Sequence, residues 1–425
     1  MRILLLTNIV PPAVAQASGA SKGVTGGWLH TVFDCLASEP SVELGIAMPM
    51  SGIIRKREGY IDGVYYYFFT EGNAKKYSKD VEKQFKIIID KFKPDIVNVF
   101  GTEYPRTLSM IEACTKEKVI ITITGAVSIY AQHYYGRVPD RYHFPSPKML
   151  LRPFINMPTL FEGKRDFRDR GKYEVEAIRH ANYFVGRTRF DKALINMWNP
   201  SAGYYSCNET LRDRFYEENW KFEKCKKHTI IVPQAGYPIK GFEVFLDALS
   251  IVKKTYPDTI VYVPGRSVFA QKNALKRKIL VYASQYDSFI QKKMQQLQLQ
   301  DSVIFTGLLD EKDLAEQMLS SNVFVLPSAI ENSPNTLGEA MLLGMPCISS
   351  FVGGVPDLLK DGEEGYLYPY DEPHILAYQI VKVFNEPDKA IEIGSRARIH
   401  AMETHNKKKN MNNLISIYKQ VYDTN

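Results

Sequence analysis

The sequence predicts an α/β protein that consists of two doubly wound, Rossmann-like domains. Short apolar runs alternate with amphipathic segments along all 425 residues, which is typical of parallel sheets covered by helices on both faces. This alternating pattern occurs twice. A chain of this length also exceeds what one ordinary hydrophobic core accommodates, so each occurrence is assigned to a domain of its own.

Ten apolar runs are the predicted strands, five in each half of the chain. The first half contributes RILLLTN, VELGIAM, DIVNVF, VIITIT and YFVGRT, and the second half contributes HTIIVPQ, TIVYVPG, SVIFTG, VFVLPS and PCISS. Segments such as KDVEKQFKIIIDKF lie between them, and their apolar residues recur with the spacing of one helical face. We therefore expect strands and helices to alternate in both domains.

The domain boundary is predicted within residues 196–228, a polar and aromatic stretch that contains no predicted strand. The N-terminal domain would span residues 1–205 and the C-terminal domain residues 206–405. The last segment, 406–425, has the pattern of a helix with no strand after it, and we expect it to pack back on the N-terminal domain.

The composition is that of an ordinary globular protein, with 45% apolar and 24% charged residues. A net charge of +7 is too small to indicate nucleic-acid binding. Five dispersed cysteines favour reduced core residues over a zinc site or a disulfide framework. The start, MRILLLTNIVPPAVAQA, is similar to a secretory signal, but its apolar run already ends at Thr7. No apolar stretch approaches the ~20 residues of a membrane span, so we expect a cytoplasmic protein.

The segment ENSPNTLGEAMLLGMPCISSFVGGVPDLL, residues 331–359, indicates a binding site for a phosphorylated ligand. It follows the predicted strand VFVLPS, and ligands of open α/β sheets bind at the carboxyl ends of the strands. Ser333 is the predicted N-cap of a helix, and Pro334 is its predicted first residue. The amides of Asn335, Thr336 and Leu337 would then have no partner inside the helix and would face a diphosphate.

Two glutamates of this segment are spaced to contact the rest of a nucleotide-sugar. Glu339 follows Asn335 by four residues, so both fall on one helical face, roughly 6 Å apart along the axis. A carboxylate at that distance from the phosphates can accept hydrogen bonds from two ribose hydroxyls. Glu331, on the loop, would face the opposite end of the diphosphate, where the sugar would lie.

With these residues, the chain resembles the retaining glycosyltransferases of family 4, which have the GT-B fold. The resemblance is carried by FVLPSAIENSPNTLGEAMLLGMPCISSFVGGVPDLLKDGEEGYLY, by VIFTGLLDEKDL and PIKGFEVFLDALSIV, and by TGGWLHTVFDCL near the N-terminus. It implies two Rossmann-like domains that face each other across a cleft, the N-terminal one binding the acceptor and the C-terminal one the nucleotide-sugar. The implied activity is transfer of a sugar, with retention of configuration, to a glycan or lipid-linked acceptor.

The resemblance also implies roles for individual residues. Glu331 would hold hydroxyls of the donor sugar and Glu339 the ribose, while the backbone near Leu309 would contact the base. The amides at the helix start would take the phosphates. Lys240, in PIKG, would neutralise the diphosphate as the glycosidic bond breaks.

The N-terminal half carries weaker site signals, and two positions depart from the family pattern. Gly26 and Gly27 would allow the backbone to approach the donor phosphate or the acceptor. Many members have an arginine shortly before the lysine, and here Arg266, in VPGRS, is the candidate for the second positive charge. Thr124 stands where many members have a histidine. His133, nine residues further on, is the candidate for a role beside the sugar, with a structural histidine as the alternative.

No Asp-x-Asp motif or other Mg²⁺ site is found in the sequence, which predicts a metal-independent reaction without a cofactor. Negative charge builds on the leaving phosphate, so positive groups held at that phosphate are the main source of catalysis. The resemblance implies transfer on one face of the sugar, with the leaving phosphate oxygen taking the proton of the acceptor. Glu331 is therefore interpreted as a positioning residue and not as a nucleophile.

Residues 137–172 hold nine Lys or Arg against four Asp or Glu, interleaved with the apolar run FPSPKMLLRPFINMPTLF. Basic residues that flank an apolar patch can dock on an anionic membrane, here the inner face of a bacterial membrane, which would suit a lipid-linked acceptor. An ordinary solvated loop and helix is the alternative. The commonest setting of the resembled family is the synthesis of bacterial cell-surface or extracellular polysaccharide.

Other functions stay open at this point. A nucleotide-sugar epimerase or hydrolase on the same scaffold would need acid and base groups around the sugar that the sequence does not reveal. A non-catalytic, partner-binding subunit is opposed by the intact pair of glutamates and by Lys240. A dinucleotide oxidoreductase is opposed by the lack of a compact G-x-G-x-x-G after the first strand. The donor sugar, the base, the acceptor, the linkage and the oligomeric state are left undetermined.

Overall fold

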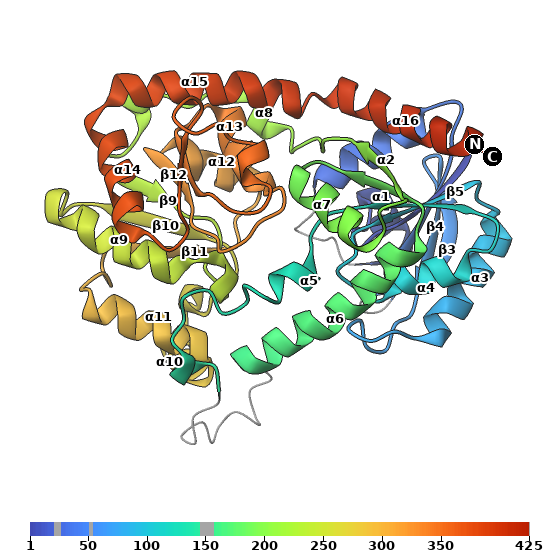
Figure 1. The fold of residues 1–425 in the computed structure, drawn as a ribbon, viewed down its shortest axis with the longest axis horizontal. Helices are drawn as coiled ribbons and strands as arrows, with labels where there is room; N and C mark the ends of the chain where they lie inside the picture. The colour runs from blue at the N-terminus through green and yellow to red at the C-terminus, as the bar shows by residue number, and fades with distance from the viewer. Residues whose placement is uncertain (21–26, 51–53, 145–156, 425) are drawn as a thin grey trace. The chain divides into compact units, whose positions relative to one another are not determined.

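The computed structural model describes residues 1–20, 27–50, 54–144 and 157–424. The chain divides into two compact units (Figure 1). Unit 1 comprises Met1–Ile129, Phe167–Leu211 and His405–Asn425, and unit 2 comprises Tyr130–Asp166 and Arg212–Thr404. None of the described helices is long and apolar enough to cross a membrane.

Unit 1 is built on an eight-stranded sheet with the strand order β3-β4-β2-β1-β5-β6-β7-β8. Neighbouring strands pair in parallel, except that β3 and β4 form an antiparallel hairpin at one edge. The strands are β1 (Arg2–Leu6), β2 (Glu43–Pro49), β3 (Glu58–Ile61), β4 (Val64–Phe69), β5 (Ile96–Phe100), β6 (Lys118–Thr122), β7 (Tyr183–Gly186) and β8 (Gly203–Ser206).

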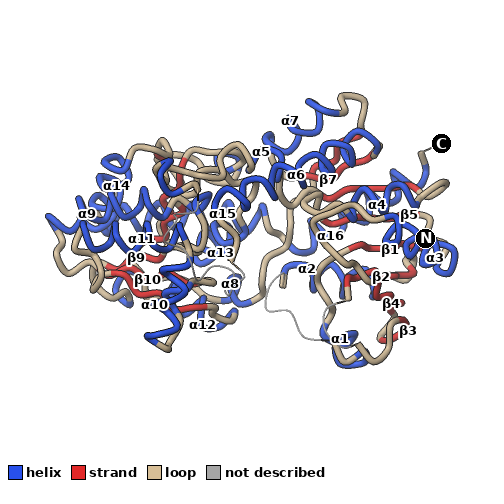
Figure 2. Tube along the Cα trace, turned by 90° about the horizontal axis from the view of Figure 1, so that it is seen from below, coloured by secondary structure: helices blue, strands red, loops and turns tan. Residues whose placement is uncertain are grey.

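Helices cover both faces of this sheet (Figure 2), as the fully apolar strands require. They are α1 (Pro12–Ser18), α2 (Trp28–Ser38), α3 (Lys79–Phe92), α4 (Arg106–Ala113), α7 (Arg189–Trp198) and α16 (Lys407–Asp423), together with most of α5 (Val127–Tyr130) and α6 (Leu160–His180).

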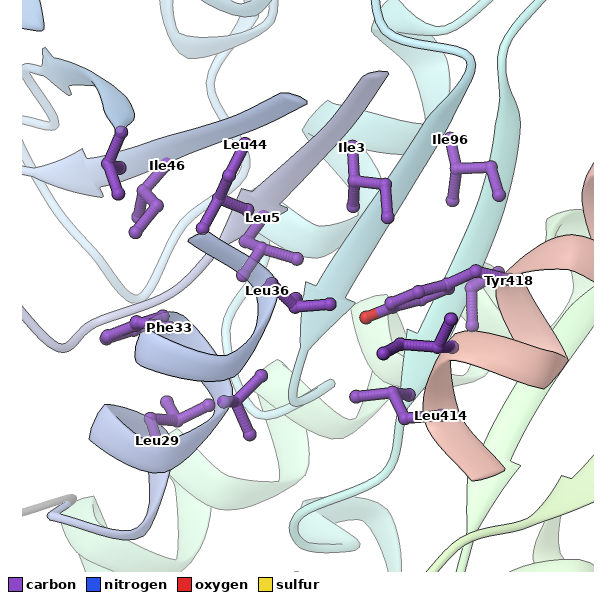
Figure 3. Close-up of a cluster of buried hydrophobic side chains, with 14 of the residues drawn as sticks. Ile3, Leu5, Leu29, Phe33, Leu36, Leu44, Ile46, Ile96, Leu414 and Tyr418 are labelled. Atoms are coloured by element: carbon purple, nitrogen blue, oxygen red, sulfur yellow. The ribbon is translucent and has the colours of Figure 1, made fainter. Parts of the chain in front are cut away.

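Helix α16, from the far end of the sequence, contributes to the core of unit 1. Its Leu414 and Tyr418 are buried among apolar side chains of β1 and α2, including Leu5 and Leu36 (Figure 3). The hydroxyl of Tyr418 accepts a 2.7 Å hydrogen bond from the side-chain amide of Asn98 on β5. Because burial of one large apolar side chain stabilises a fold by about 1.5–3 kcal/mol, these contacts tie the C-terminal segment firmly to unit 1.

Unit 2 is built on a six-stranded parallel sheet with the order β11-β10-β9-β12-β13-β14. Because all six strands run in one direction, the loops that follow them lie at one edge of the sheet. The strands are β9 (Thr229–Ile231), β10 (Ile260–Pro264), β11 (Val303–Gly307), β12 (Val323–Leu326), β13 (Cys347–Ser350) and β14 (Tyr366–Tyr368).

The helices of unit 2 also cover both faces of its sheet (Figure 2). They are α8 (Arg214–Glu217), α9 (Phe242–Thr255), α10 (Ala274–Ala283), α11 (Gln285–Gln296), α12 (Glu311–Leu319), α13 (Asn335–Leu343), α14 (Pro373–Asn385) and α15 (Pro387–Thr404), with the short 3₁₀ helices η1 (Asp140–Tyr142) and η4 (Pro238–Lys240).

All ten predicted strands are present, and the structure adds four more, β3, β4, β8 and β14. Strand β8 lies in the stretch 196–228, which was expected to contain none; it is a four-residue edge strand and is too short to give a clear pattern. The division into units differs from the predicted boundary at 205/206, because Tyr130–Asp166 belongs to unit 2 and residues 206–211 belong to unit 1.

Candidate functional site

Lys240 and Glu331 form a buried ion pair at the carboxyl edge of the sheet of unit 2. Lys240 ends η4, after β9, and Glu331 lies on the loop after the neighbouring strand β12. The distance from Lys240 Nζ to Glu331 Oε1 is 2.6 Å, and the two side chains are only 15% and 10% exposed. Burial alone would lower the pKa of Lys240, but the adjacent carboxylate raises it above its usual value. The ammonium group is therefore charged at neutral pH.

Close backbone contacts hold the two loops that carry this pair. The amide of Ala329 donates to the carbonyl of Ile239, at 2.7 Å. Gly241 has a φ of +64°, and a Cβ at this position would lie 1.8 Å from the carbonyl oxygen of Pro327. Glycine is therefore required next to Lys240, because any side chain would push the two loops apart. The 2.7 Å hydrogen bond from the Ser328 hydroxyl to Glu331 Oε1 further fixes the carboxylate.

The pair Gly353 and Gly354 holds the backbone of the Glu331 loop from the other side. The amide of Gly354 donates to the carbonyl of Glu331, at 3.1 Å. A Cβ on Gly353, whose φ is +51°, would lie 1.9 Å from that same carbonyl oxygen. The two glycines thus allow the loop after β13 to approach the site.

Helix α13 begins at Asn335, one residue later than the sequence predicts. Pro334 is extended, with φ −73° and ψ 111°, and it takes the N-cap position that was predicted for Ser333. The amide of Leu337 donates to the carbonyl of Pro334 at 3.0 Å, so it is not available to a ligand as predicted. The amide of Thr336, in contrast, donates to no acceptor in the described part of the chain. The helix thus keeps a free donor and the positive end of its dipole beside the Lys240 loop.

Glu339, on α13, is paired with Arg212, which the sequence analysis did not single out. Arg212 Nε and Nη2 donate to the two carboxylate oxygens, both at 2.7 Å. Burial raises the pKa of Glu339, and the guanidinium opposes this by favouring the carboxylate. Each carboxylate oxygen has two lone pairs, so a bidentate arginine leaves one acceptor position on each oxygen for a ribose hydroxyl.

The remaining donor-side candidates follow the strand order of the sheet. Leu309 lies on the loop after β11, Arg266 on the loop after β10, Lys240 after β9 and Glu331 after β12, and these four strands are neighbours in that order. Leu309 is half-buried and Arg266 is exposed. The guanidinium of Arg266 forms no ion pair within the described residues. A Cβ on Gly236, in the loop of Lys240, would lie 2.9 Å from the carbonyl oxygen of Arg266.

His133 and Gly27 do not lie on the loops that follow β9, β10, β11 and β12. His133 is an exposed residue of the segment Tyr130–Asp166, and the protein around its ring lowers its pKa by desolvation. Tyr130, at the start of the same segment, contacts the loop that carries Glu331. The hydroxyl of Tyr130 accepts a hydrogen bond from the amide of Asn332, at 3.1 Å. Gly27 is the N-cap of α2 in unit 1 and has an ordinary helical φ of −55°. Gly26 lies outside the described residues.

A buried glutamate that sequence reasoning missed ties the segment Tyr130–Asp166 to the site loops. Glu243 lies in the first turn of α9, directly after the loop of Lys240, and is 1% exposed. Its carboxylate accepts hydrogen bonds from the amide of Arg137, at 2.9 Å, and from the hydroxyl of Tyr370, at 3.2 Å. Burial raises the pKa of Glu243, and the backbone donor opposes this. The partners are more than one hundred residues apart, so no local pattern could have revealed the contact.

Unit 1 has a second acidic group, at the carboxyl edge of its own sheet. Glu103 follows β5, and its Oε1 accepts a 2.6 Å hydrogen bond from the hydroxyl of Thr124, which follows β6. A Cβ on Gly101, whose φ is +92°, would lie 2.2 Å from Oε2, and one on Gly125 would lie 2.7 Å from Oε1. Oε2 receives no hydrogen bond from the part of the chain that the structure describes. Glu103 also lines a pocket with Asn8, which follows β1.

Glu174 of α6 lies behind this edge and is fully buried. Its carboxylate accepts hydrogen bonds from the Thr102 hydroxyl, at 2.6 Å, and from the amides of Val127 and Ser128, at 3.1 and 2.7 Å. Burial raises the pKa of Glu174 from 4.5 to about 7, although these donors oppose the change. The folded protein therefore binds this proton more tightly than the unfolded chain does.

This pKa predicts a dependence of stability on pH. The contribution of Glu174 is fully present below about pH 4.5 and is lost as the pH rises to about 7, by about 3 kcal/mol in total. Glu174→Gln removes the titrating group, so the stability of this variant should fall less over that range. The measurement is the urea midpoint of both proteins between about pH 5 and about pH 8. Parallel curves for the two proteins would contradict the assignment.

Comparison with known protein families finds a match within unit 2. Residues 215–400 match the family described as glycosyl transferases group 1. The matched range covers the sheet of unit 2 from β9 to β14 and includes Lys240, Glu331 and Glu339. No group of three or more His, Cys, Asp or Glu that could hold a metal ion occurs among the residues described.

Individual proteins are similar to this chain over part of its length. The N-acetyl-alpha-D-glucosaminyl L-malate synthase of Bacillus anthracis is 31% identical over 126 residues, which are 30% of this chain and 32% of that protein. A putative colanic acid biosynthesis glycosyltransferase, WcaL of Salmonella typhimurium, is 25% identical over 163 residues, covering 37% and 40%. The chain thus spans 32% to 40% of the length of these curated relatives.

Solved structures of similar fold cover the whole chain. Sucrose-phosphate synthase from Thermosynechococcus elongatus superimposes with a TM-score of 0.71 at 15% identity, covering 99% of both chains. Anabaena Alr3699/HepE, in complex with UDP and glucose, gives a TM-score of 0.67 at 14% identity, covering 99% of this chain and 100% of that one. At such low sequence identity, the similarity is evidence for the fold alone. The superposition confirms the predicted fold class, GT-B with two Rossmann-like domains.

Proposed function

We propose that this protein is a retaining glycosyltransferase that moves a sugar from a nucleotide-sugar donor to a glycan or lipid-linked acceptor. The observation that supports this most is the buried pair of Lys240 and Glu331, placed beside the start of α13. The free amide of Thr336 and the ammonium of Lys240 are both donors suited to a diphosphate. The family match over unit 2 and the UDP bound by the Anabaena relative agree with a donor of this class.

The proposed chemistry follows from where charge develops. The bond between the anomeric carbon and the diphosphate oxygen breaks, and negative charge builds on that oxygen. Lys240 carries three N–H donors and uses one on Glu331, so two are available to the leaving phosphate. The leaving oxygen takes the proton of the acceptor hydroxyl, which bonds to the anomeric carbon from the same face. Glu331 holds a sugar hydroxyl and keeps Lys240 in place.

Glu339 is proposed to hold the ribose, and Arg212 to keep its carboxylate ionised. Arg266 would supply a second positive charge at the diphosphate, and the backbone at Leu309 would contact the base. His133 and Gly27 are retained as candidates beside the sugar and the phosphate. No metal and no cofactor is proposed to take part in the reaction.

The acceptor hydroxyl is proposed to be held by unit 1, at Glu103. This carboxylate is fixed by Thr124, which stands in place of the histidine of many relatives, and its Oε2 has no partner within the described residues. Glu103→Gln should raise the acceptor KM about 10- to 100-fold, the effect of losing a hydrogen bond to a charged group, and leave the donor KM unchanged. Glu112→Gln, which removes an exposed carboxylate of the same unit, is the control. An unchanged acceptor KM in Glu103→Gln would remove this residue from the acceptor site.

The biological setting proposed is the synthesis of bacterial cell-surface or extracellular polysaccharide, on the cytoplasmic side of the membrane. It is supported by the named role of the Salmonella relative in colanic acid synthesis. A lipid-linked acceptor would require the enzyme to work at a membrane surface.

Product analysis tests the proposed activity. The protein is incubated with a panel of UDP-, GDP- and ADP-sugars, with and without a mixture of lipid-linked and free glycans, and in the presence of EDTA. We expect release of the nucleoside diphosphate that depends on the acceptor, a product with the anomeric configuration of the donor, and no effect of EDTA. Isomerised donor without acceptor would instead identify an epimerase, and release without any transfer a hydrolase. Inverted configuration would overturn the retaining mechanism.

A further inference from the structure

Helix α10 carries apolar side chains on its exposed side. Leu275 is 70% exposed, Ile279 39% and Tyr282 50%. They are spaced four and three residues apart, and at about 100° per residue they fall within roughly 60° of each other around the helix. Val281 is buried and lies roughly 130° from the middle of this group around the helix, so the helix packs on its unit with another side. The three exposed residues are called the α10 stripe.

All charged residues in the sequence segment around the α10 stripe are positive. Between Asp258 and Asp287 the sequence has no acidic residue, and it has five basic ones, Arg266, Lys272, Lys276, Arg277 and Lys278. Lys276 and Lys278 lie on either flank of the stripe by the same angular count. Both are exposed, and no described acidic side chain forms an ion pair with them. A helix that is apolar on its outer side and basic on its flanks matches the interfacial region of an anionic bilayer.

Exposed apolar residues alone would not support this conclusion, because single ones are common on protein surfaces. Helix α15 of the same unit shows the difference. Ile399 is 73% exposed and Met402 39%, but the acidic residues Glu392 and Glu403 lie on the same helix. The exposed apolar residues of α15 thus lie beside acidic ones, whereas α10 has no acidic residue.

We propose that α10 docks unit 2 on an anionic lipid surface. The helix would lie in the plane of the interface, with the α10 stripe among the acyl chains and Lys276 and Lys278 at the lipid phosphates. Figures 1 and 2 both show α10 at the periphery of its unit. Its N-terminus is fixed by the side chain of Asn273, which accepts from the amide of Lys276 at 2.9 Å, so the helix is formed before it meets a membrane.

This surface differs from the basic segment 137–172 that the sequence suggested for membrane contact. Part of that segment lies outside the described residues. Two of its described arginines are directed at the protein: Arg170 is buried and donates to the carbonyl of Glu103, and Arg137 donates to the carbonyl of Asp371. Docking through α10 is also independent of the glycosyl transfer proposed above, since vesicle binding is measured without turnover.

The test is flotation of the full-length protein with vesicles of phosphatidylglycerol and phosphatidylcholine in equal parts, and with pure phosphatidylcholine. We expect binding to the anionic vesicles only, and weaker binding at high salt. The double variant Lys276→Gln, Lys278→Gln should lower the partition coefficient about 25-fold, since each charge near the surface contributes about fivefold. Leu275→Ser with Ile279→Ser should lower it about tenfold or more. These side chains are exposed, so the fold should tolerate their replacement.

Two matched variants separate a local effect from a general one. Lys408→Gln with Lys409→Gln remove the same net charge from α16, and Ile399→Ser with Met402→Ser remove an exposed apolar pair from α15. Both should bind vesicles like the parent. The proposal is overturned if the parent does not float with anionic vesicles, or if the α10 variants bind as well as the parent. It is also overturned if sedimentation shows a dimer that the α10 variants dissociate, because the stripe would then be an interface between two copies.

Discussion

Replacing Lys240 with methionine is expected to lower kcat by about 10²- to 10³-fold, the usual effect of removing one preorganised donor from a developing negative charge. Glu331→Gln is expected to cause a loss of the same order, because the carboxylate positions both the donor sugar and Lys240. The Michaelis constant for the donor should change less than kcat in Lys240→Met, since the charge on the diphosphate grows mainly as the bond breaks.

Loss of folding could imitate this result, since the pair is buried and a lone buried charge destabilises a protein by about 3–5 kcal/mol. The double variant Lys240→Met, Glu331→Gln leaves no uncompensated charge and should recover most of the stability, but none of the turnover. Lys293→Met is the matched control: Lys293 is 17% exposed and pairs with Asp247 at 2.6 Å in the same unit, away from the site loops. It should lose stability and keep its turnover. A folded Lys240→Met protein with turnover within a few-fold of the parent would exclude Lys240 from the chemistry.

Arg212→Ala is expected to raise the donor KM about 10- to 100-fold at neutral pH, with recovery as the pH increases. Burial raises the pKa of Glu339, and Arg212 counteracts it. Without the guanidinium the pKa rises further, so a larger fraction of Glu339 is protonated at neutral pH and accepts hydrogen bonds from the ribose less well. Raising the pH removes that proton and restores the acceptor. The measurement is the donor KM of parent and variant as a function of pH.

The shape of the pH profile separates this role from a purely structural one. Arg212→Lys keeps the positive charge and should retain much of the donor affinity. Arg214→Ala is the control, because Arg214 lies on the adjacent turn and pairs at the surface with Glu218. A pH-independent increase of the KM in Arg212→Ala would mean that the arginine only supports the local fold. An unchanged KM would separate Glu339 from the donor altogether.

The parts of the fold that the sequence predicted are those with strong local signals. Buried parallel strands are continuous apolar runs, and all ten of these were found. The hairpin of β3 and β4 was missed although its turn, Asp62-Gly63, has the Asp-Gly sequence and positive φ values at both residues that favour such hairpins. Strand β8 is too short for a periodic signal. The assignment of Tyr130–Asp166 to unit 2 depends on contacts of Glu243 and Asn332 with residues far away in the sequence.

The same distinction holds for the candidate site. Glu331, Asn335 and Glu339 could be proposed because they follow a recognisable strand and have a fixed spacing, and Lys240 because the segment PIKG resembles the family. The ion pair between Lys240 and Glu331 spans 91 residues, and the one between Arg212 and Glu339 spans 127, so neither could be derived from local pattern. The N-terminus of α13 was misplaced by one residue because a serine before a proline is a good N-cap in general, whereas here Pro334 is extended.

The most direct test is a crystal structure of the protein with the nucleoside diphosphate, of UDP, GDP and ADP, that stabilises it most in a thermal-shift screen. We expect the terminal phosphate within about 3 Å of Lys240 Nζ and of the Thr336 amide, with both ribose hydroxyls on Glu339. A nucleotide bound in unit 1, or in unit 2 away from the loops after β9 and β12, would contradict the proposed donor site.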